Sequence, residues 1–304
     1  MRLFIRIRLL VIVTSFVLIV SGCSAAGSGA EGKYIIDADS VTKLISQENT
    51  IFVDMQKPED YSKAHVIGAV NITRNDIIVN EPVTNMLAPK EMIEKVMGSN
   101  GIANDTLVIA YDNTDNMDAA RLWWTLRVYG HEQVKVVSGG IKALQKAGVE
   151  LSSEKTAITS VEFSAKDSDE SLIATKNEAL AQVNEPKEDI VLLDTRSQEE
   201  FNQGTIPGSV LLDYANNNNS DGTYKSGHAI IMQYNDLGIK PEQTVIMYCK
   251  TSIRAAQTYL ALANVGYENL KLYDGAWLEW TADEALPSQK PSVSPVQPSK
   301  ADVS

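Results

Sequence analysis

Residues 243–276, QTVIMYCKTSIRAAQTYLALANVGYENLKLYDGA, contain two strand patterns with a helix pattern between them. The apolar run TVIMY comes first, a short turn leads from it into the helix, and the second apolar run closes in DGA. Residues 105–140, DTLVIAYDNTDNMDAARLWWTLRVYGHEQVKVVSGG, repeat this order and close in SGG. Strands that alternate with helical patterns of about 10–15 residues indicate parallel α/β units.

A second pair of segments points to the same duplication. Residues 50–72, TIFVDMQKPEDYSKAHVIGAVNI, parallel residues 189–212, DIVLLDTRSQEEFNQGTIPGSVLL. In each segment an apolar strand ends in an aspartate, Asp54 or Asp194, before an acidic helical turn and a glycine-containing turn. The sequence therefore predicts an α/β protein of two similar domains, each with a mainly parallel sheet flanked by helices.

The repeats and the composition of the segments around them divide the chain. The stretch between the copies is polar, and the C-terminal stretch is rich in proline and serine, a composition typical of disordered segments. We expect a leader at residues 1–22 and a flexible tether at 23–33. The N-terminal domain should span 34–150, the linker 151–171 and the C-terminal domain 172–283, with a disordered tail at 284–304.

The first 22 residues have the pattern of an export signal. The basic start MRLFIRIR precedes the apolar run LLVIVTSFVLIV, which is shorter than the roughly 20 residues of a membrane-spanning helix. The run ends in VSGC, which resembles the bacterial lipobox, where the cysteine is lipidated. We expect Cys23 to anchor the protein outside the cytoplasm, on a cell membrane or an outer membrane. The alternative is an ordinary secretory signal.

Charge and cysteine content narrow the classes of partner and site. The 304 residues include 27 Lys and Arg against 39 Asp and Glu, a formal net charge of −12. This balance argues against nucleic acid or anionic lipid as a partner of the folded part. Lipidation of Cys23 would leave Cys249 as the one free thiol of the 2 cysteines. Such a thiol is either a buried small hydrophobe or a reactive group.

The two copies differ at positions that can do chemistry. Cys249 in the second copy aligns with Asp112 in the first, and Arg196 aligns with Gln56. A strand that stops just before a helix starts leaves backbone N–H groups free in the turn, and the helix N-terminus adds partial positive charge. We therefore expect Cys249 to be a thiolate nucleophile in an anion-binding turn with a basic rim.

At these residues the sequence resembles rhodanese-type sulfurtransferases. The tandem arrangement, the strand–Cys–turn–helix segment and DTRSQEEFNQGTIPGS carry the resemblance, and the first copy is similar to the inactive N-terminal domain of the two-domain enzymes. The resemblance implies that Cys249 takes a sulfane sulfur from a donor such as thiosulfate or 3-mercaptopyruvate, holds it as a persulfide and passes it to cyanide or a thiol. It implies no organic cofactor and no metal. The substrate-binding residues that it implies are Arg196, Lys250, Thr251, Ser252, Ile253 and Arg254.

The turn itself departs from the two-domain enzymes. CKTSIR matches neither their thiosulfate-type nor their mercaptopyruvate-type loop, and it is closer to the loop of single-domain rhodaneses, which often ends in arginine. Thr205 stands where the family's Gly-His-Ile-Pro-Gly turn has histidine. The sequence therefore leaves the sulfur donor open.

Other interpretations of these residues remain. Cys249 could be an inert core thiol, and the protein a non-catalytic module that binds a partner or senses redox state. A rhodanese-like phosphatase or an arsenate reductase is a further alternative, but such phosphatases have a loop one residue longer than the six residues from Cys249 to Arg254. Arg254 could cap the helix, and Arg196 could instead pair with one of three carboxylates, those of Asp194, Glu199 and Glu200.

Overall fold

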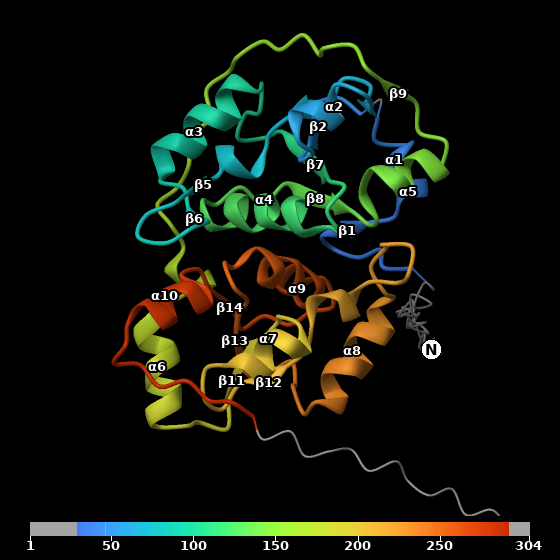
Figure 1. Ribbon diagram of the computed structural model, residues 1–304. Helices are drawn as coiled ribbons and strands as arrows, with labels where there is room; N and C mark the ends of the chain where they lie inside the picture. The colour runs from blue at the N-terminus through green and yellow to red at the C-terminus, as the bar shows by residue number, and fades with distance from the viewer. Residues whose placement is uncertain (1–28, 46, 292–304) are drawn as a thin grey trace, which may run out of the picture.

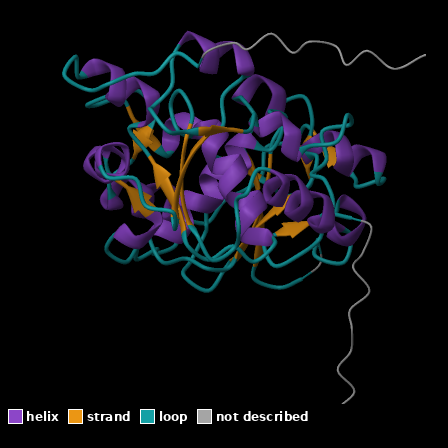
Figure 2. Ribbon diagram, turned by 90° about the horizontal axis from the view of Figure 1, so that it is seen from below, coloured by secondary structure: helices purple, strands orange, loops and turns teal. Residues whose placement is uncertain are grey.

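Two α/β domains of the same architecture are stacked one on the other (Figure 1). This computed structural model describes residues 29–45 and 47–291, so Cys23 lies outside the described residues. Each domain is built on a five-stranded parallel sheet with helices on both faces (Figure 2). The predicted fold class is confirmed.

The two sheets have equivalent strand orders. The N-terminal sheet runs β1-β8-β7-β2-β4, with bounds Ile35–Ile36, Val134–Val137, Leu107–Tyr111, Thr50–Asp54 and Val70–Asn71. The C-terminal sheet runs β10-β14-β13-β11-β12, with bounds Ile173–Ala174, Leu270–Tyr273, Thr244–Tyr248, Ile190–Asp194 and Val210–Leu211. The central strands are apolar runs because helices bury them from both sides.

Helices and short strand pairs complete each domain. Helices α1 to α5 span Ala38–Val41, Pro58–Tyr61, Lys90–Ser99, Met117–Val128 and Gly140–Lys146. Helices α6 to α10 span Lys176–Asn184, Gln198–Gln203, Gly227–Asp236, Ile253–Asn264 and Ala276–Ala282. The 3₁₀ helices η1 to η3 span Arg74–Asp76, Glu170–Leu172 and Tyr214–Asn217. The antiparallel pairs β3–β9 and β5–β6 join His65–Val66 to Leu151–Ser152 and Ile78–Val79 to Met86–Leu87.

The strand register places the two aligned turns at the same point of each sheet. Tyr111 ends β7 and Tyr248 ends β13, and each lies opposite the aspartate that ends the neighbouring strand. The next residues, Asp112 and Cys249, therefore leave the carboxyl end of the central strand of their own sheet. This confirms the alignment of the two copies. The carboxyl ends of parallel strands are also where α/β folds commonly place their sites.

Helices α4 and α9, which follow these turns, pack against each other between the two sheets (Figure 1). The rings of Trp123 on α4 and Tyr259 on α9 have centroids 5.9 Å apart, and Tyr34 meets Trp123 edge-on at 5.0 Å. Trp123 and Trp124 are both buried. One apolar cluster runs from the N-terminal sheet through these helices into the C-terminal sheet.

The linker after β9 crosses the outside of the N-terminal domain before it reaches η2 (Figure 1). Its backbone docks on α3, where the Val161 amide donates to the Gly98 carbonyl at 3.0 Å, and Phe163 is buried. A Cβ atom at Gly98 would lie 2.6 Å from the Val161 oxygen. The close approach of the two backbones therefore requires glycine at this position.

The prediction of a disordered tail is wrong for its first residues. Gln289 and Thr205 exchange two backbone hydrogen bonds of 2.9 Å each, and Trp280 donates from Nε1 to the Pro287 carbonyl at 2.8 Å. The turn at Thr205 has a free backbone edge, which an extended segment can satisfy without burying much apolar surface. Residues 292–304 lie outside the described residues. Among the described residues, no helix has the length and apolar character needed to cross a membrane.

Candidate active site

Cys249 lies between β13, the central strand of the C-terminal sheet, and helix α9. The residue is 1% exposed, and it forms no disulfide with any described residue. The Cys249 carbonyl accepts a hydrogen bond from the Trp277 amide at 3.0 Å, and the Lys250 carbonyl accepts one from the Leu278 amide at 3.2 Å. The start of α10 therefore holds the backbone of the turn.

The turn enters the helix through Ser252, whose φ of +66° lies in the left-handed region. This region is rarely occupied by residues other than glycine, but here it lets three residues connect Cys249 to Ile253, the first residue of α9. Within the described part of the chain, the N–H groups of residues 250–255 donate to no oxygen atom. They are therefore free to bind an anion at the start of the helix.

In the N-terminal domain a side chain occupies the corresponding N–H groups. Asp112 Oδ1 accepts from the amides of Thr114 and Asn116 at 3.0 Å each. Asp112 Oδ2 accepts from the amides of Asp118 and Ala119 at 2.9 and 3.0 Å. Burial, together with the nearby Asp118 carboxylate, raises the pKa of Asp112 to about 6. The Asp112 carboxyl group thus accepts hydrogen bonds from N–H groups whose counterparts in the C-terminal domain have no acceptor among the described residues.

Arg254 forms a bidentate ion pair with Glu200 at the edge of the turn. Its Nη1 and Nη2 donate to Glu200 Oε2 and Oε1 at 2.6 and 2.8 Å. These hydrogen bonds lower the pKa of Glu200 to about 2. Burial opposes the charge of Arg254, but Glu200 and the neighbouring Cys249 together raise the pKa of this guanidinium above its ordinary value. Arg254 is thus a fixed cation beside Cys249 rather than a simple helix cap.

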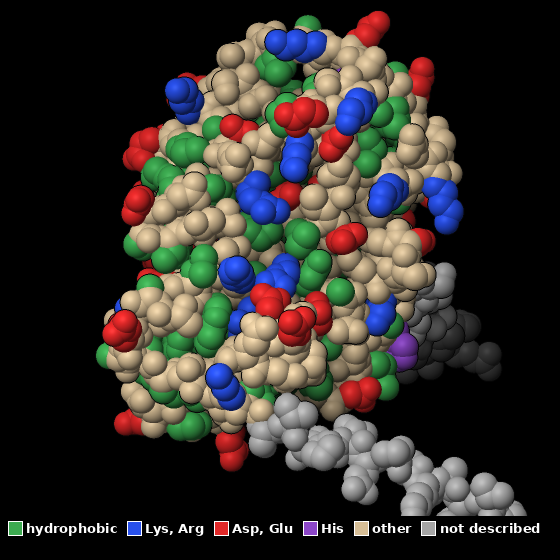
Figure 3. All heavy atoms as spheres, viewed as in Figure 1, with side chains coloured by type: hydrophobic (Ala, Val, Ile, Leu, Met, Phe, Trp, Pro, Cys, Tyr) green, Lys and Arg blue, Asp and Glu red, His purple; other side chains and the backbone are tan. Residues whose placement is uncertain are grey.

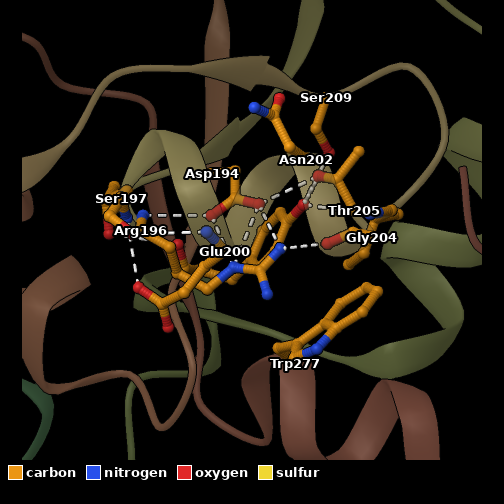
Figure 4. A network of polar contacts seen from close by, with 12 residues as sticks. Asp194, Arg196, Ser197, Glu200, Asn202, Gly204, Thr205, Ser209 and Trp277 are labelled. Carbon is orange, nitrogen blue, oxygen red and sulfur yellow. Dashed lines mark hydrogen bonds and ion pairs between the residues drawn. The ribbon is translucent and has the colours of Figure 1, made fainter. Parts of the chain in front are cut away.

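Arg196 is almost fully buried and pairs with Asp194, one of the three carboxylates considered above (Figure 4). Its Nη2 donates to Asp194 Oδ2 and to the Gly204 carbonyl, both at 2.6 Å. Its guanidinium carbon lies 4.4 Å from the centroid of the Trp277 ring. In the other domain Gln56 bonds to Asp54 and to the Ala64 carbonyl in the same way. The contacts of Arg196 connect the end of β11 to the residue after α7 and to α10.

Thr205 belongs to the same network. Its Oγ1 donates to Asp194 Oδ2 at 2.9 Å and lies 2.7 Å from the hydroxyl oxygen of Tyr248, the residue before Cys249 (Figure 4). Thr205 therefore supports the end of β13, which directly precedes Cys249.

The remaining predicted substrate-binding residues differ in exposure. Lys250 is exposed, Thr251 is half-buried, and Ser252 and Ile253 are buried. Ser252 Oγ lies 3.0 Å from Asp274 Oδ1. On the face shown in Figure 3, lysine and arginine side chains are interspersed with acidic ones, so this surface has mixed charge.

Four residues around the turn were not predicted as site residues from the sequence. They are Glu200, the partner of Arg254, and three residues whose side chains contact Ser252 or Thr251, namely Asp274, Arg121 and Asn85. For Glu200 a local signal exists: SQEE is a capping-box pattern, and Ser197 and Glu200 form that box at the start of α7. No local signal marks the contacts of Arg121 and Asn85, because these two residues belong to the other domain.

The family profile described as "Rhodanese-like domain" matches residues 37–147 and 175–283. The chain belongs to the rhodanese-like family. A rhodanese-like relative from Mycolicibacterium smegmatis, named "Putative thiosulfate sulfurtransferase", is 28% identical over 270 residues, which cover 83% of this chain and 95% of the relative. A relative of the same name from Haloferax volcanii is 30% identical over 248 residues, which cover 76% and 85% of the two chains.

The rhodanese-like fold of the chain is also similar to a solved structure. It matches the anaerobic ergothioneine biosynthesis enzyme from Chlorobium limicola with a TM-score of 0.76 at 24% identity, over 84% of this chain and 70% of the other. At this identity the similarity concerns the fold.

Proposed function

We propose that this rhodanese-like protein is a sulfurtransferase that carries a sulfane sulfur on Cys249. The supporting observation is the open N–H array of residues 250–255 next to a buried thiol, in a fold whose other copy fills the array with Asp112. A persulfide anion would be stabilised by such donors and by the helix N-terminus. The names of the two relatives favour thiosulfate as the donor.

The proposed reaction has two steps with balanced bonds and charges. The Cys249 thiolate attacks the outer sulfur of thiosulfate, a new S–S bond forms, the S–S bond of thiosulfate breaks, and sulfite leaves with the electron pair. The persulfide anion then lies against the free N–H groups. In the second step cyanide or a thiolate attacks the terminal sulfur, departs with it, and returns Cys249 to the thiolate. No external oxidant or reductant is needed.

The surrounding charges suggest separate roles. Lys250 is exposed and free to attract an anionic donor, whereas Arg254 is held by Glu200 beside Cys249. Arg196, whose guanidinium is bonded to Asp194 and Gly204, supports the end of β11 rather than binding the donor.

The proposal is tested by turnover with different donors. We expect the purified protein to form thiocyanate from cyanide with thiosulfate, and more slowly with 3-mercaptopyruvate, and the Cys249→Ser variant to form none. Activity that survives in this variant would contradict the role of Cys249. Cys249-dependent hydrolysis of a phosphate ester would instead indicate a phosphatase, and no turnover of any of these substrates would favour a non-catalytic module.

We also propose that Cys23 carries a lipid that anchors the protein outside the cytoplasm. The proposal rests on the leader pattern, which ends in VSGC. Expressed in a bacterium, the full chain should sediment with membranes, and the Cys23→Ala variant should be released from them or remain unprocessed. Equal membrane association of both proteins with the leader removed from both would contradict lipid attachment at Cys23.

A further inference from the structure

Arg121 belongs to helix α4 of the N-terminal domain, yet its guanidinium contacts the turn that carries Cys249. It is fully buried, and its Nη1 donates to Ser252 Oγ at 2.9 Å and to Asp274 Oδ1 at 2.6 Å. Ser252 is the residue with left-handed backbone through which the turn enters α9. A residue that is not glycine keeps this conformation when its surroundings fix it. Arg121 is part of those surroundings.

The hairpin β5–β6 of the N-terminal domain adds further contacts to the same turn. Asn85 donates from Nδ2 to Thr251 Oγ1 at 3.0 Å, and its carbonyl accepts from Arg121 Nη2 at 3.1 Å. The Leu87 amide donates to Asp274 Oδ2 at 2.6 Å. Asp274 thus accepts a hydrogen bond from each of two segments of the N-terminal domain. It lies just before α10, whose first residues bond to the backbone of the Cys249 turn.

At the equivalent turn of the N-terminal domain, the described residues place no guanidinium from the other domain. At the Asp112 turn both Asp115 and Asn116 have left-handed backbone, and Asn116, which precedes α4 as Ser252 precedes α9, donates to Asn218 Oδ1 and to the Gly222 carbonyl of the C-terminal domain. The position on α9 that corresponds to Arg121 on α4 is Gln257, whose side chain bonds to Asn218 of its own domain. Asn218 and Gly222 lie in a C-terminal loop that crosses to the Asp112 turn, as the β5–β6 hairpin crosses to the Cys249 turn. Duplication alone therefore explains both crossing loops. It does not explain a buried guanidinium on the side of Cys249.

We infer that Arg121 is a positioning residue for sulfur transfer, through which the N-terminal domain completes the active site. It fixes Ser252, and Ser252 sets the direction of the N–H groups of Arg254 and Ala255 at the start of α9. The inference rests on the proposed function of Cys249. A displacement of about 1 Å in such an array is enough to slow a reaction by up to about 100-fold without any loss of a reacting group.

The test compares single-turnover loading of Cys249 from thiosulfate with thermal stability in four variants. Arg121→Gln should load at least about tenfold more slowly, with kcat reduced and KM little changed, because Arg121 does not touch the donor. Arg121→Lys should recover part of the rate, since lysine keeps the charge but not the planar set of donors. Arg121→Gln with Asp274→Asn removes both buried charges, so its melting temperature should return toward wild type while loading stays slow.

The control is Asn218→Ala, which removes a hydrogen bond between the two domains at the Asp112 turn. It should lower the melting temperature and leave the loading rate unchanged. The inference is overturned if Arg121→Gln loads at the wild-type rate, or if loading follows the melting temperature across all four variants. Failure of the wild-type protein itself to load sulfur would instead refute the proposed function, and the inference with it.

Discussion

Asp112 and Cys249 follow the central strands of the two sheets, yet their turns have opposite properties. The Asp112 carboxyl group accepts four backbone hydrogen bonds, whereas the amides of residues 250–255 have no oxygen acceptor in the described chain. The open array therefore presents unpaired donors, next to a helix N-terminus, to an incoming anion.

Replacing the aspartate should not create a second active site. We expect Asp112→Cys, in a Cys249→Ser background, to take up no sulfur from thiosulfate, measured by mass spectrometry. The position that corresponds to Arg254 is Asp118, whose carboxylate pairs with Arg74 and would repel an anionic donor. Sulfur on the introduced cysteine would show that the N-terminal turn is competent after all.

Glu200 should make stability depend on pH in the acid range. Its pKa of about 2 in the folded protein lies below its usual 4.5, because it accepts hydrogen bonds from Arg254. A lowered carboxyl pKa stabilises the fold above about pH 4.5, and this contribution is lost as the pH falls toward 2. Urea unfolding should therefore show that the deficit of Glu200→Gln relative to wild type shrinks over this range. A constant deficit would contradict the ion pair, and the exposed neighbour in Glu199→Gln serves as the control.

At the scale of elements, the close packing of backbones limits what each helix tolerates. Helix α3 contacts the linker at Gly98 and Val161. Helices α4 and α9 form the domain interface, where Trp123 packs against Tyr259. Periodicity in the sequence predicts the helices, but it does not show which face meets the linker, since the linker is polar and lacks a pattern of its own.

Alanine at position 98 should destabilise the protein although it favours a helix. Gly98→Ala would gain up to about 1 kcal/mol of helix propensity. The added Cβ would meet the Val161 carbonyl oxygen at 2.6 Å, and displacement of the linker costs about 1–3 kcal/mol. Urea denaturation should show a net loss for Gly98→Ala and a change within about 0.5 kcal/mol for the exposed neighbour in Ser99→Ala. A stabilised Gly98→Ala would refute the close contact.

At the scale of the whole molecule, the sequence predicts what depends on neighbouring residues in the chain. Apolar runs and helical patterns predict two similar α/β domains, and their alignment places Cys249 at the end of a central strand. The contact between Arg121 and Ser252 joins residues 131 positions apart, and it exists because α4 and α9 pack across the interface. The order of the first tail residues likewise depends on a distant backbone edge at Thr205. Such contacts follow from the assembled fold rather than from local patterns.

The most direct test of the account is the mass of Cys249 after exposure to a sulfane donor. Reduced protein is incubated with thiosulfate, freed of excess donor and examined by intact-mass and peptide mass spectrometry. We predict one added sulfur atom on the peptide that contains Cys249, its loss on addition of cyanide with release of thiocyanate, and no addition in Cys249→Ser. An unmodified Cys249 after incubation with both thiosulfate and 3-mercaptopyruvate would contradict the proposal that this turn carries sulfur.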